Sequence, residues 1–356
     1  MTRSHSRRKL DHLLICIEED VRAKGTSTGL ERYRLRHCAL PELDLRDVDL
    51  GTEFLGKHLK APLLVSAMTG GTARARMLNR NLAQAAQEFG IAMGVGSQRA
   101  AIEDHSQIPT YQVRDVAPDI LLFANVGAVQ LNYGYGLAEC RQAVEMIGAD
   151  ALILHLNPLQ EALQPHGNTD FSGLLLKIED ICRDIEVPVI AKEVGWGISA
   201  SVARQLAEAG IAALDVAGAG GTSWSEVEKH RSRNGLQHRI AADFADWGIP
   251  TAQAIHEIRT ALPDVPLIGS GGIQSGPEAA IALALGADLV GLARPLLKAA
   301  TVSAKAVHEQ LEVLVEGLRT ALFAAGIRDI ASLSSQPLEE AQRSSSGSMV
   351  TRGDST

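Results

Sequence analysis

Eight short apolar runs recur along the chain, each about five residues long. They are rich in β-branched residues and apolar on both faces, which is typical of strands buried on both sides of a parallel sheet. Longer segments with helical periodicity lie between them. The alternation predicts βαβ units, with strands at 63–67, 91–95, 120–124, 151–155, 187–191, 212–216, 266–270 and 288–292 and helices at Asn79–Phe89, Leu137–Ile147, Leu174–Ile185, Ala200–Ala209 and Pro277–Leu285.

Eight such units favour an α/β fold of the (β/α)8 TIM-barrel type. The alternative is an open, doubly wound sheet. Against that alternative, no GxGxxG motif follows the first predicted strand, and glycine-rich turns follow the first, sixth and seventh strands instead. We therefore expect the sheet to close into a barrel.

Three segments fall outside the repeat. Residues 1–60 form an N-terminal extension, in which a helix is predicted over Lys9–Ala23, and residues 61–333 form the barrel. Within the barrel, residues 223–250 are a long charged insertion, typical of an active-site lid or a disordered loop. Residues 334–356 are rich in Ser and are predicted to be a flexible, disordered tail.

Composition narrows the classes of protein. The 356 residues are 46% hydrophobic and carry a net charge of −8, which is globular and argues against a nucleic-acid-coating protein. No run of about 18 apolar residues exists, so no membrane span is expected. The N-terminus shows neither the continuous apolar segment nor the small-residue cleavage site of a secretory signal, so none is expected. Four scattered cysteines without a CxxC motif predict reduced thiols in a cytoplasmic protein.

Polar or glycine-rich residues follow all eight predicted strands, where α/β barrels place their chemistry. Polar residues can also be ordinary loop starters, but eight out of eight favours a site. The segments are Ser66–Gly71, Gly96–Arg99, Asn125, His155–Glu161, Lys192–Glu193, Ala217–Thr222, Gly269–Gly272 and Ala293–Arg294.

The last two segments each precede a helix, which predicts a phosphate site made of bare backbone and helix N-termini, with a hydroxyl added by Thr222. Two tight βα turns are the structural alternative. Lys192 follows an apolar strand, so it is either a Schiff-base nucleophile or a cation that faces an anionic cofactor. The polar groups on neighbouring strands favour the cofactor, a planar heterocycle with a phosphate such as FMN.

A basic cluster opens the N-terminal helix. Arg8 and Lys9 in this cluster, together with Arg99, could clamp a diphosphate, although a solvated charge run is the ordinary interpretation. Glu161 could bind Mg²⁺, which takes one or two carboxylates plus phosphate oxygens. His155 is either a satisfied hydrogen-bonding residue or a catalyst, and no zinc-type spacing is present.

Together these motifs resemble the type 2 isopentenyl-diphosphate isomerases, in order and over roughly residues 5–330. The matching pieces are Arg8-Lys9-x-Asp11-His12, Ala67–Gly71, Gly96–Arg99, His155-Leu156-Asn157 with Gln160-Glu161, Lys192–Gly195, Gly220-Gly221-Thr222, Trp247–Thr251 and Gly271-Gly272-Ile273. The ordered combination is specific, although no single piece is diagnostic. One departure is visible at Ala217, where a hydroxyl residue is expected.

The resemblance implies an FMN-bound barrel that interconverts isopentenyl and dimethylallyl diphosphate with no net redox change. It implies reduced FMN as the acid/base, Mg²⁺ on the diphosphate, and NADPH as the electron source. FMN contacts would come from Ser66, Ala67, Met68, Thr69, Ser97, Asn125, Lys192, Thr222, Gly271, Gly272, Ala293 and Arg294. Substrate contacts would come from Arg8, Lys9, Ser97, Gln98, Arg99, His155 and Gln160, with Gln160 and His155 supporting catalysis and Glu161 binding the metal.

Three other functions fit the barrel less well. A 2-hydroxy-acid oxidase or dehydrogenase needs a His–Gly–Gly–Arg type segment, and the glycine-rich segment at Ala217–Thr222 has no His. An IMP-dehydrogenase-like activity needs a cysteine nucleophile in a barrel loop, and none is placed there. A non-catalytic barrel that binds a phosphorylated ligand is separated only by turnover. The resemblance also implies a homo-oligomer, either a tetramer or an octamer.

Overall fold

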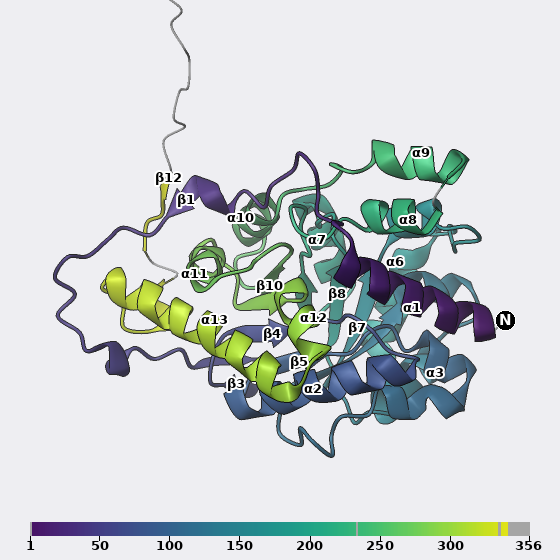
Figure 1. Ribbon diagram of the computed structural model, residues 1–356, viewed down its shortest axis with the longest axis horizontal. Coiled ribbons are helices and arrows are strands. Elements are labelled where there is room, and N and C mark those ends of the chain that lie inside the picture. The colour runs from purple at the N-terminus through teal and green to yellow at the C-terminus, as the bar shows by residue number, and fades with distance from the viewer. Residues whose placement is uncertain (1, 233, 334–335, 341–356) are drawn as a thin grey trace, which may run out of the picture.

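Eight parallel strands close into a barrel around the centre of the molecule (Figure 1). The computed structural model describes residues 2–232, 234–333 and 336–340, with side chains from Arg8 onward. Strand β11 pairs with β4 and closes the ring, so the TIM barrel is confirmed and the open sheet is wrong. The strands are β4 (Leu63–Val65), β5 (Ala92–Gly94), β6 (Leu122–Gly127), β7 (Ala151–Leu156), β8 (Val189–Glu193), β9 (Ala213–Asp215), β10 (Leu267–Ser270) and β11 (Leu289–Leu292).

Helices surround the barrel and alternate with its strands. Some of them begin at side-chain caps; Thr72, for example, accepts a hydrogen bond from the backbone of Ala75 at the start of α2, which begins six residues earlier than predicted. The helices are α1 (Thr2–Glu18), α2 (Ala73–Phe89), α3 (Arg99–Glu103), α4 (Leu137–Glu145), α5 (Pro158–Leu163), α6 (Leu174–Asp184), α7 (Ala200–Glu208), α8 (Trp224–Ser232), α9 (Leu236–Asp243), α10 (Thr251–Ala261), α11 (Gly276–Ala284), α12 (Arg294–Ala300), α13 (Ala304–Ala324) and α14 (Ile330–Leu333).

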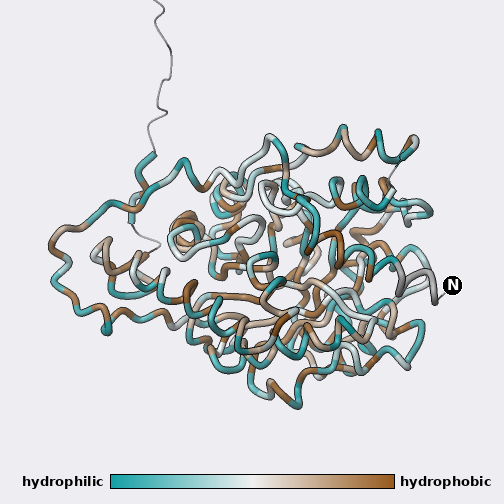
Figure 2. Tube along the Cα trace, in the orientation of Figure 1, coloured by the Kyte–Doolittle hydropathy of each residue, from teal (hydrophilic) through white to brown (hydrophobic). Residues whose placement is uncertain are grey.

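The core has two parts. A large cluster fills the space between the strands and the outer helices, and a smaller one fills the barrel interior. In Figure 2 brown segments run through the middle of the molecule, while teal segments lie mainly toward the outside. Phe54 and Leu59 belong to the interior cluster. They come from the hairpin of β2 (Thr52–Phe54) and β3 (Lys57–Leu59), which therefore plugs the amino end of the barrel.

Polar residues sit one layer above the apolar barrel interior. Successive side chains of a strand alternate between its two faces, so residues i and i+2 face the same side. Ile153 belongs to the interior cluster and His155 follows two residues later; Ile190 is followed in the same way by Lys192. The pattern repeats on four more strands: Leu64 and Ser66, Phe123 and Asn125, Ala213 and Asp215, and Ile268 and Ser270.

At the amino ends of the strands, two arginines make matching sets of contacts, and each connects two neighbouring strands. Arg114 donates to Asp150 at 2.7 Å, just before β7, and Arg259 donates to Asp288 at 2.7 Å, just before β11. Each aspartate also accepts the N–H of the first leucine of the preceding strand. We call these groups the two arginine clamps; their carbonyl acceptors are Ala117, Pro118, Ile120 and Gly148 in the first and Leu262, Pro263, Val265 and Gly286 in the second.

The segments outside the repeat differ from their predictions. The N-terminal helix occupies Thr2–Glu18 rather than Lys9–Ala23, and Arg22 instead bridges Thr222 in the barrel. The insertion at 223–250 contains α8 and α9, so it is an ordered helical pair and not a disordered loop. In the predicted tail, β12 (Glu339–Glu340) pairs with β1 (Tyr33–Arg34), while residues 334–335 and 341–356 lie outside the described residues.

Candidate active site

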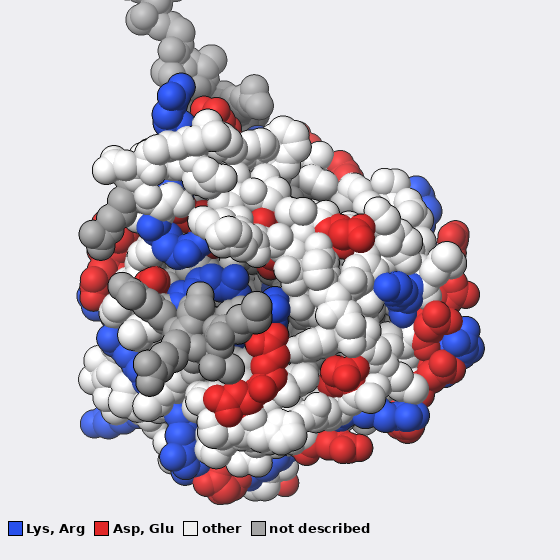
Figure 3. Space-filling model, turned by 90° about the vertical axis from the view of Figure 1, so that its right-hand side faces the viewer, with Lys and Arg blue, Asp and Glu red and all other residues white. Residues whose placement is uncertain are grey.

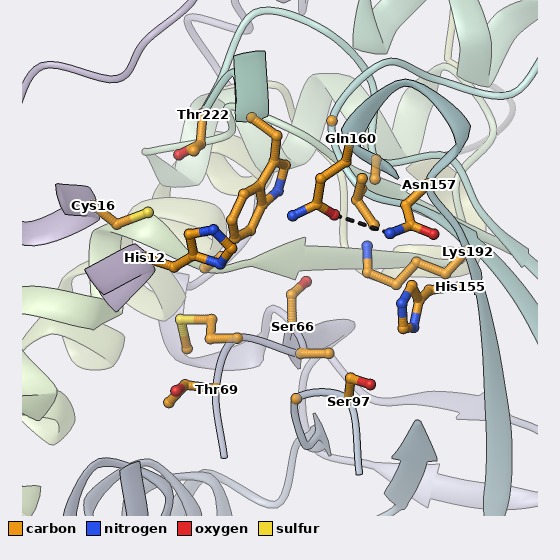
Figure 4. A pocket seen from close by; sticks show the side chains of 18 of the residues that line it. His12, Cys16, Ser66, Thr69, Ser97, His155, Asn157, Gln160, Lys192 and Thr222 are labelled. Atoms are coloured by element: carbon orange, nitrogen blue, oxygen red, sulfur yellow. Dashed lines mark hydrogen bonds between the residues drawn. The ribbon is translucent and has the colours of Figure 1, made fainter. Parts of the chain in front are cut away.

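One cavity of about 290 Å³ opens at the carboxyl ends of the barrel strands. Its floor consists of strand ends, and its roof consists of α1 and the first residue of α8, two segments that lie far apart in the sequence (Figure 1). Figure 4 shows polar side chains from both layers converging on this space. Of the predicted site residues, all but Gln98 line it, with Arg8, Lys9 and Arg99 beside Ser66–Thr69, Ser97, Asn125, His155, Gln160, Glu161, Lys192, Thr222, Gly271, Gly272, Ala293 and Arg294.

His155 is held in one tautomer. Asn125 donates its amide N–H to the carbonyl of Val95 at 3.0 Å, which turns its Oδ1 toward His155. The Nδ1 of His155 lies 2.7 Å from that oxygen and must therefore carry the proton. Burial, together with the nearby cations of Lys192 and Lys9, lowers the pKa of His155 to about 4. At neutral pH the ring is uncharged, with Nε2 as an acceptor.

Lys192 is paired with a carboxylate that the sequence analysis did not single out. Its Nζ lies 3.0 Å from Oδ2 of Asp215, on the adjacent strand, and the aspartate is fully buried. The other oxygen of Asp215 accepts a hydrogen bond from the hydroxyl of Ser270. The contact with a buried carboxylate favours the cofactor-facing interpretation of Lys192 over a Schiff-base nucleophile, since a nucleophilic amine needs a free lone pair.

Glycines form the cavity floor at the carboxyl ends of strands β9 to β11. A Cβ atom on Gly221 would lie 2.5 Å from the backbone nitrogen of Gly272, and one on Gly272 would lie 2.5 Å from Thr28, so neither side chain can exist. The start of α12 has no side-chain cap, whereas α11 is closed by its own capping box of Ser275 and Glu278. A phosphate cradle here therefore rests on the glycine backbone and the start of α12.

The roof is basic and aromatic. Arg8 and Lys9 lie on α1, and burial lowers the pKa of both, that of Lys9 to about 7. His12, one turn further along α1, contacts Glu228 of α8 at 2.8 Å and meets the ring of Trp224 edge-on at 5.2 Å. Figure 3 shows Lys and Arg side chains gathered on the face where α1 begins. The roof thus presents positive charge to the cavity.

Three residues at the exit of β7 form an oxygen-rich corner. Asn157 donates its amide to Gln160 at 3.1 Å and to Glu161 at 3.0 Å, which leaves its own Oδ1 buried without a partner among the described residues. Figure 4 shows the amide nitrogen of Gln160 turned away from Asn157. Glu161 is buried and also accepts the N–H of Asn168 at 2.6 Å. Amide and carboxylate oxygens suit Mg²⁺, which keeps most ligands as water or phosphate.

Gln98 lies behind the cavity wall. Its side chain donates to the carbonyl of Ala143 at 2.7 Å and accepts the N–H of Asn125 at 2.8 Å, so both ends are occupied within the fold. The structure thus places it as a support for Asn125 and not as a contact for substrate. Its position next to Ser97 in the sequence gave no sign of this difference.

Sequence reasoning missed several cavity residues. Trp224 and Cys16 belong to the roof, Gln130 also lines the cavity, and Arg22 adds a cation beside Thr222. The signal for Trp224 and Arg22 was weak, because both belong to segments that were interpreted as loop or helix. Burial raises the pKa of Cys16 to about 12, so this thiol is inert at neutral pH.

Comparison with known proteins identifies the family. The sequence profile of the family described as FMN-dependent dehydrogenase matches residues 2–114 and 157–340, which is most of the chain. The chain belongs to the FMN-dependent dehydrogenase family. A mandelate oxidase mutant of this fold, solved with an FMN adduct, superposes with a TM-score of 0.65 at 19% identity, covering 95% of this chain and 99% of the oxidase. At that identity the likeness shows the fold alone.

Relatives with much higher sequence identity to this chain share one name. Isopentenyl-diphosphate delta-isomerase of Nostoc sp. is 55% identical over 319 residues, covering 90% of this chain and 91% of the relative. That of Stutzerimonas stutzeri is 56% identical over 327 residues, covering 92% and 94%. The chain therefore belongs to the isomerase group within the family, and the resemblance drawn from its motifs is confirmed. In the described part of the chain, no helix has the length and hydropathy needed to span a membrane.

Proposed function

We propose that the protein interconverts isopentenyl diphosphate and dimethylallyl diphosphate with reduced FMN and Mg²⁺ bound and with NADPH as the source of electrons. The observation that carries the proposal is the meeting of two surfaces in one cavity. A polar layer of barrel side chains faces upward, and the basic face of α1 faces downward. A flat anionic cofactor and a small anionic substrate can be sandwiched between such surfaces.

The floor fits FMN. The glycine backbones of Gly221 and Gly272 leave a cradle that a Cβ would fill. Ser66 lines the cavity with a buried hydroxyl that has no partner among the described residues, and Lys192 supplies a cation beside it. Reduced FMN would supply both an acid/base and an electron-rich face for the cationic character that double-bond migration develops. Asn125 and Lys192 would fix its polar edge.

The corner at β7 fits Mg²⁺. The described residues contain no cluster of three or more His, Cys, Asp or Glu side chains for a metal. A magnesium ion bound by one carboxylate and by substrate phosphates needs none. Glu161 and the unpartnered Oδ1 of Asn157 would hold it beside the diphosphate.

The remaining side chains would bind and position the substrate. Arg8, Lys9 and Arg99 would clamp the diphosphate, and Trp224 would cover the hydrocarbon end and exclude water. His155 is neutral at pH 7, so it would accept or orient a hydrogen bond and would not donate a proton as an imidazolium. Gln160 would direct its amide N–H groups into the cavity.

The test is an anaerobic assay with FMN, NADPH, Mg²⁺ and isopentenyl diphosphate in D₂O, with the product read by mass. Dimethylallyl diphosphate that carries solvent deuterium, only when the flavin is reduced, is the expected result. A yellow protein without turnover in any redox state would contradict the proposal and leave a binding barrel.

Glu161→Gln sharpens the metal assignment. We expect kcat/KM to fall about 100-fold or more, since removing one charge-stabilising group typically costs that much, and the Mg²⁺ dependence to weaken while flavin stays bound. The matched control is Glu179→Gln, an exposed residue on α6 that should behave as wild type. Loss of flavin from Glu161→Gln would instead assign the carboxylate to the fold.

Two further proposals concern location and assembly. We propose a cytoplasmic protein that assembles as a homo-oligomer, either a tetramer or an octamer. All four cysteines are free thiols, which supports a reducing compartment. Light scattering of the purified protein would measure the assembly, and a monomeric mass at assay concentration would contradict it.

A further inference from the structure

Tyr111 lies just outside the cavity and is fully buried. It ends the 3-10 helix η3 (His105–Thr110) and packs its ring against the glycine pair after β4. A Cβ atom on Gly70 would lie 1.9 Å from the Tyr111 ring, and one on Gly71 would lie 3.3 Å from its hydroxyl. The N–H of Gly71 is already donated to Thr110 at 2.8 Å. The glycine pair therefore makes room for Tyr111.

The hydroxyl of Tyr111 joins a closed triangle of hydrogen bonds. It donates to the carbonyl of Ser97 at 2.7 Å and accepts from Nζ of Lys9 at 2.6 Å. Lys9 also donates to the same carbonyl at 2.7 Å. Because a phenol has one proton and a carbonyl has none, the directions of these bonds are fixed. Burial raises the pKa of Tyr111, so the proton stays in place at any physiological pH.

The triangle connects two parts of the chain that are remote in sequence. Lys9 belongs to α1, and Ser97 follows β5 in the barrel; both line the cavity, whereas Tyr111 does not. The ammonium lies on the hydroxyl side of the Tyr111 ring, 5.2 Å from its centre. One turn further along α1, His12 contacts Glu228. The helix is thus anchored to the barrel at Lys9 and to α8 at His12, on one face.

An ammonium group has three N–H donors, and the triangle engages two of them. The third remains for a ligand in the cavity that Lys9 lines. Without the Tyr111 hydroxyl, Lys9 would keep only the carbonyl of Ser97, and that carbonyl would lose a donor. Both a cavity cation and the backbone of a cavity serine would then gain freedom, which costs binding free energy when a ligand orders them again.

We propose that Tyr111 is a positioning residue for the diphosphate: its hydroxyl holds Lys9 and Ser97 together, so that α1 presents a preoriented cation to the substrate. This inference rests on the proposed function for the identity of the ligand. It extends the site to a residue that touches neither cofactor nor substrate.

The experiment compares holoenzymes of wild type, Tyr111→Phe, Lys9→Met and the double variant. For Tyr111→Phe we expect KM to rise about tenfold with kcat within twofold, and the dissociation constant for magnesium pyrophosphate to rise by the same factor. FMN affinity, measured by fluorescence quenching, should not change. In the double-mutant cycle Tyr111→Phe should add no further loss to Lys9→Met, because the two act through one contact.

Tyr133→Phe is the matched control. Its hydroxyl also accepts one hydrogen bond, from the N–H of Asp170 at 3.0 Å, but it lies outside the cavity lining. We expect wild-type KM and wild-type pyrophosphate binding. An equal rise in KM for Tyr133→Phe would show that the loss of any tyrosine hydroxyl has this effect and would overturn the inference.

Three further outcomes separate the causes of failure. Losses that add in the double-mutant cycle would make Tyr111 and Lys9 independent, and would overturn the role of Tyr111 while the isomerase stands. Wild-type enzyme that neither turns over nor binds pyrophosphate would instead overturn the proposed function. If Tyr111→Phe unfolds, Lys9→Met tests the same triangle: faster trypsin cleavage after Arg8, unaffected by pyrophosphate, is expected, and unchanged cleavage would contradict the anchoring of α1.

Discussion

The contacts made at the amino ends of the barrel strands differ from those made at the carboxyl ends of the same strands. At the amino ends, the clamps of Arg114 and Arg259 are nearly superimposable in their contacts, although they lie four strands apart, half a turn of the barrel. At the carboxyl ends of the same two strands the cavity surfaces differ: β6 carries Asn125, which hydrogen-bonds His155, whereas β10 is followed by the bare backbone of Gly271 and Gly272. The β6 side of the cavity presents polar side chains, and the β10 side presents backbone groups.

The difference indicates that the amino ends of the strands contribute stability, whereas the carboxyl ends provide the groups for chemistry. The amino ends of two opposite strand pairs, β6/β7 and β10/β11, are held in the same way, so a repeated device serves both halves and contributes stability. The carboxyl ends hold an ion pair, a neutral buried histidine and an open glycine floor, which are arrangements that cost stability and provide chemistry. Four predictions follow from this division, in order of decreasing effect.

Lys192→Met should have the largest effect, at the carboxyl end. It leaves the Asp215 carboxylate buried without its cation, which typically costs about 3–5 kcal/mol. Adding Asp215→Leu should recover most of that loss, because the pair itself contributes little net stability. Urea unfolding of the apo protein measures both. Equal free energies of unfolding for wild type and Lys192→Met would contradict the prediction that the unpaired Asp215 carboxylate destabilises the fold.

Arg259→Ala should lower the free energy of unfolding by about 2–3 kcal/mol, because it leaves backbone carbonyls without a donor and the Asp288 carboxylate without its cation. Arg114→Ala should match it within about 1 kcal/mol, since the contacts repeat. Flavin binding and turnover at low temperature should stay at the wild-type level in both variants. A selective loss of flavin from either variant would break the separation between the two ends.

The pKa of Lys9 predicts a pH effect on binding. With the pKa lowered to about 7, the amine is neutral above that pH, and an anion that binds next to it must restore the proton. Pyrophosphate affinity should therefore fall by up to about tenfold per pH unit above pH 7, a cost of about 1.4 kcal/mol per unit. Lys9→Arg stays charged and serves as the control for the titration of pyrophosphate itself. Parallel profiles for the two proteins would contradict the assignment.

Ala217→Gly should have the smallest effect and the opposite sign. Ala217 has a φ of 36°, in the left-handed region that favours glycine. Relief of this strain should outweigh the added freedom of the unfolded chain and raise the free energy of unfolding by about 0.5 kcal/mol. Ala191→Gly, in the ordinary backbone of β8, should lower it. Calorimetry of both would show whether strain is confined to the carboxyl end.

Periodicity was sufficient to predict the barrel, because each buried strand needs an apolar run and each crossover needs a helix. It could not predict the ends of α1, since the charges at its start and the polar residues beyond Glu18 fit a helix equally well. The insertion at 223–250 was charged enough to suggest a loop, but its helix α8 buries Glu226 and Glu228 in ion pairs. Local charge patterns do not reveal such pairing.

Most cavity residues could be predicted because they follow strands directly. The residues that act from behind them could not. Asp215 lies inside the apolar run at 212–216 and was taken as part of it, the side chain of Gln98 was expected in the cavity but lies behind its wall, and Tyr111 gave no local signal. The clamps left one trace in the sequence: Gly-Ala-Asp occurs at both 148–150 and 286–288, just before β7 and β11.

The roof helix also sets an order of events during synthesis. Lys9 leaves the ribosome early, but Tyr111 follows about a hundred residues later, Glu228 later still, and the ring closes only when β11 pairs with β4. At 5–20 residues per second, α1 waits roughly 15–60 s for its complete docking surface. During that interval an amphipathic helix has nowhere to bury its apolar face. A segment that is made before the barrel is thus completely docked only after the last barrel strand has been made.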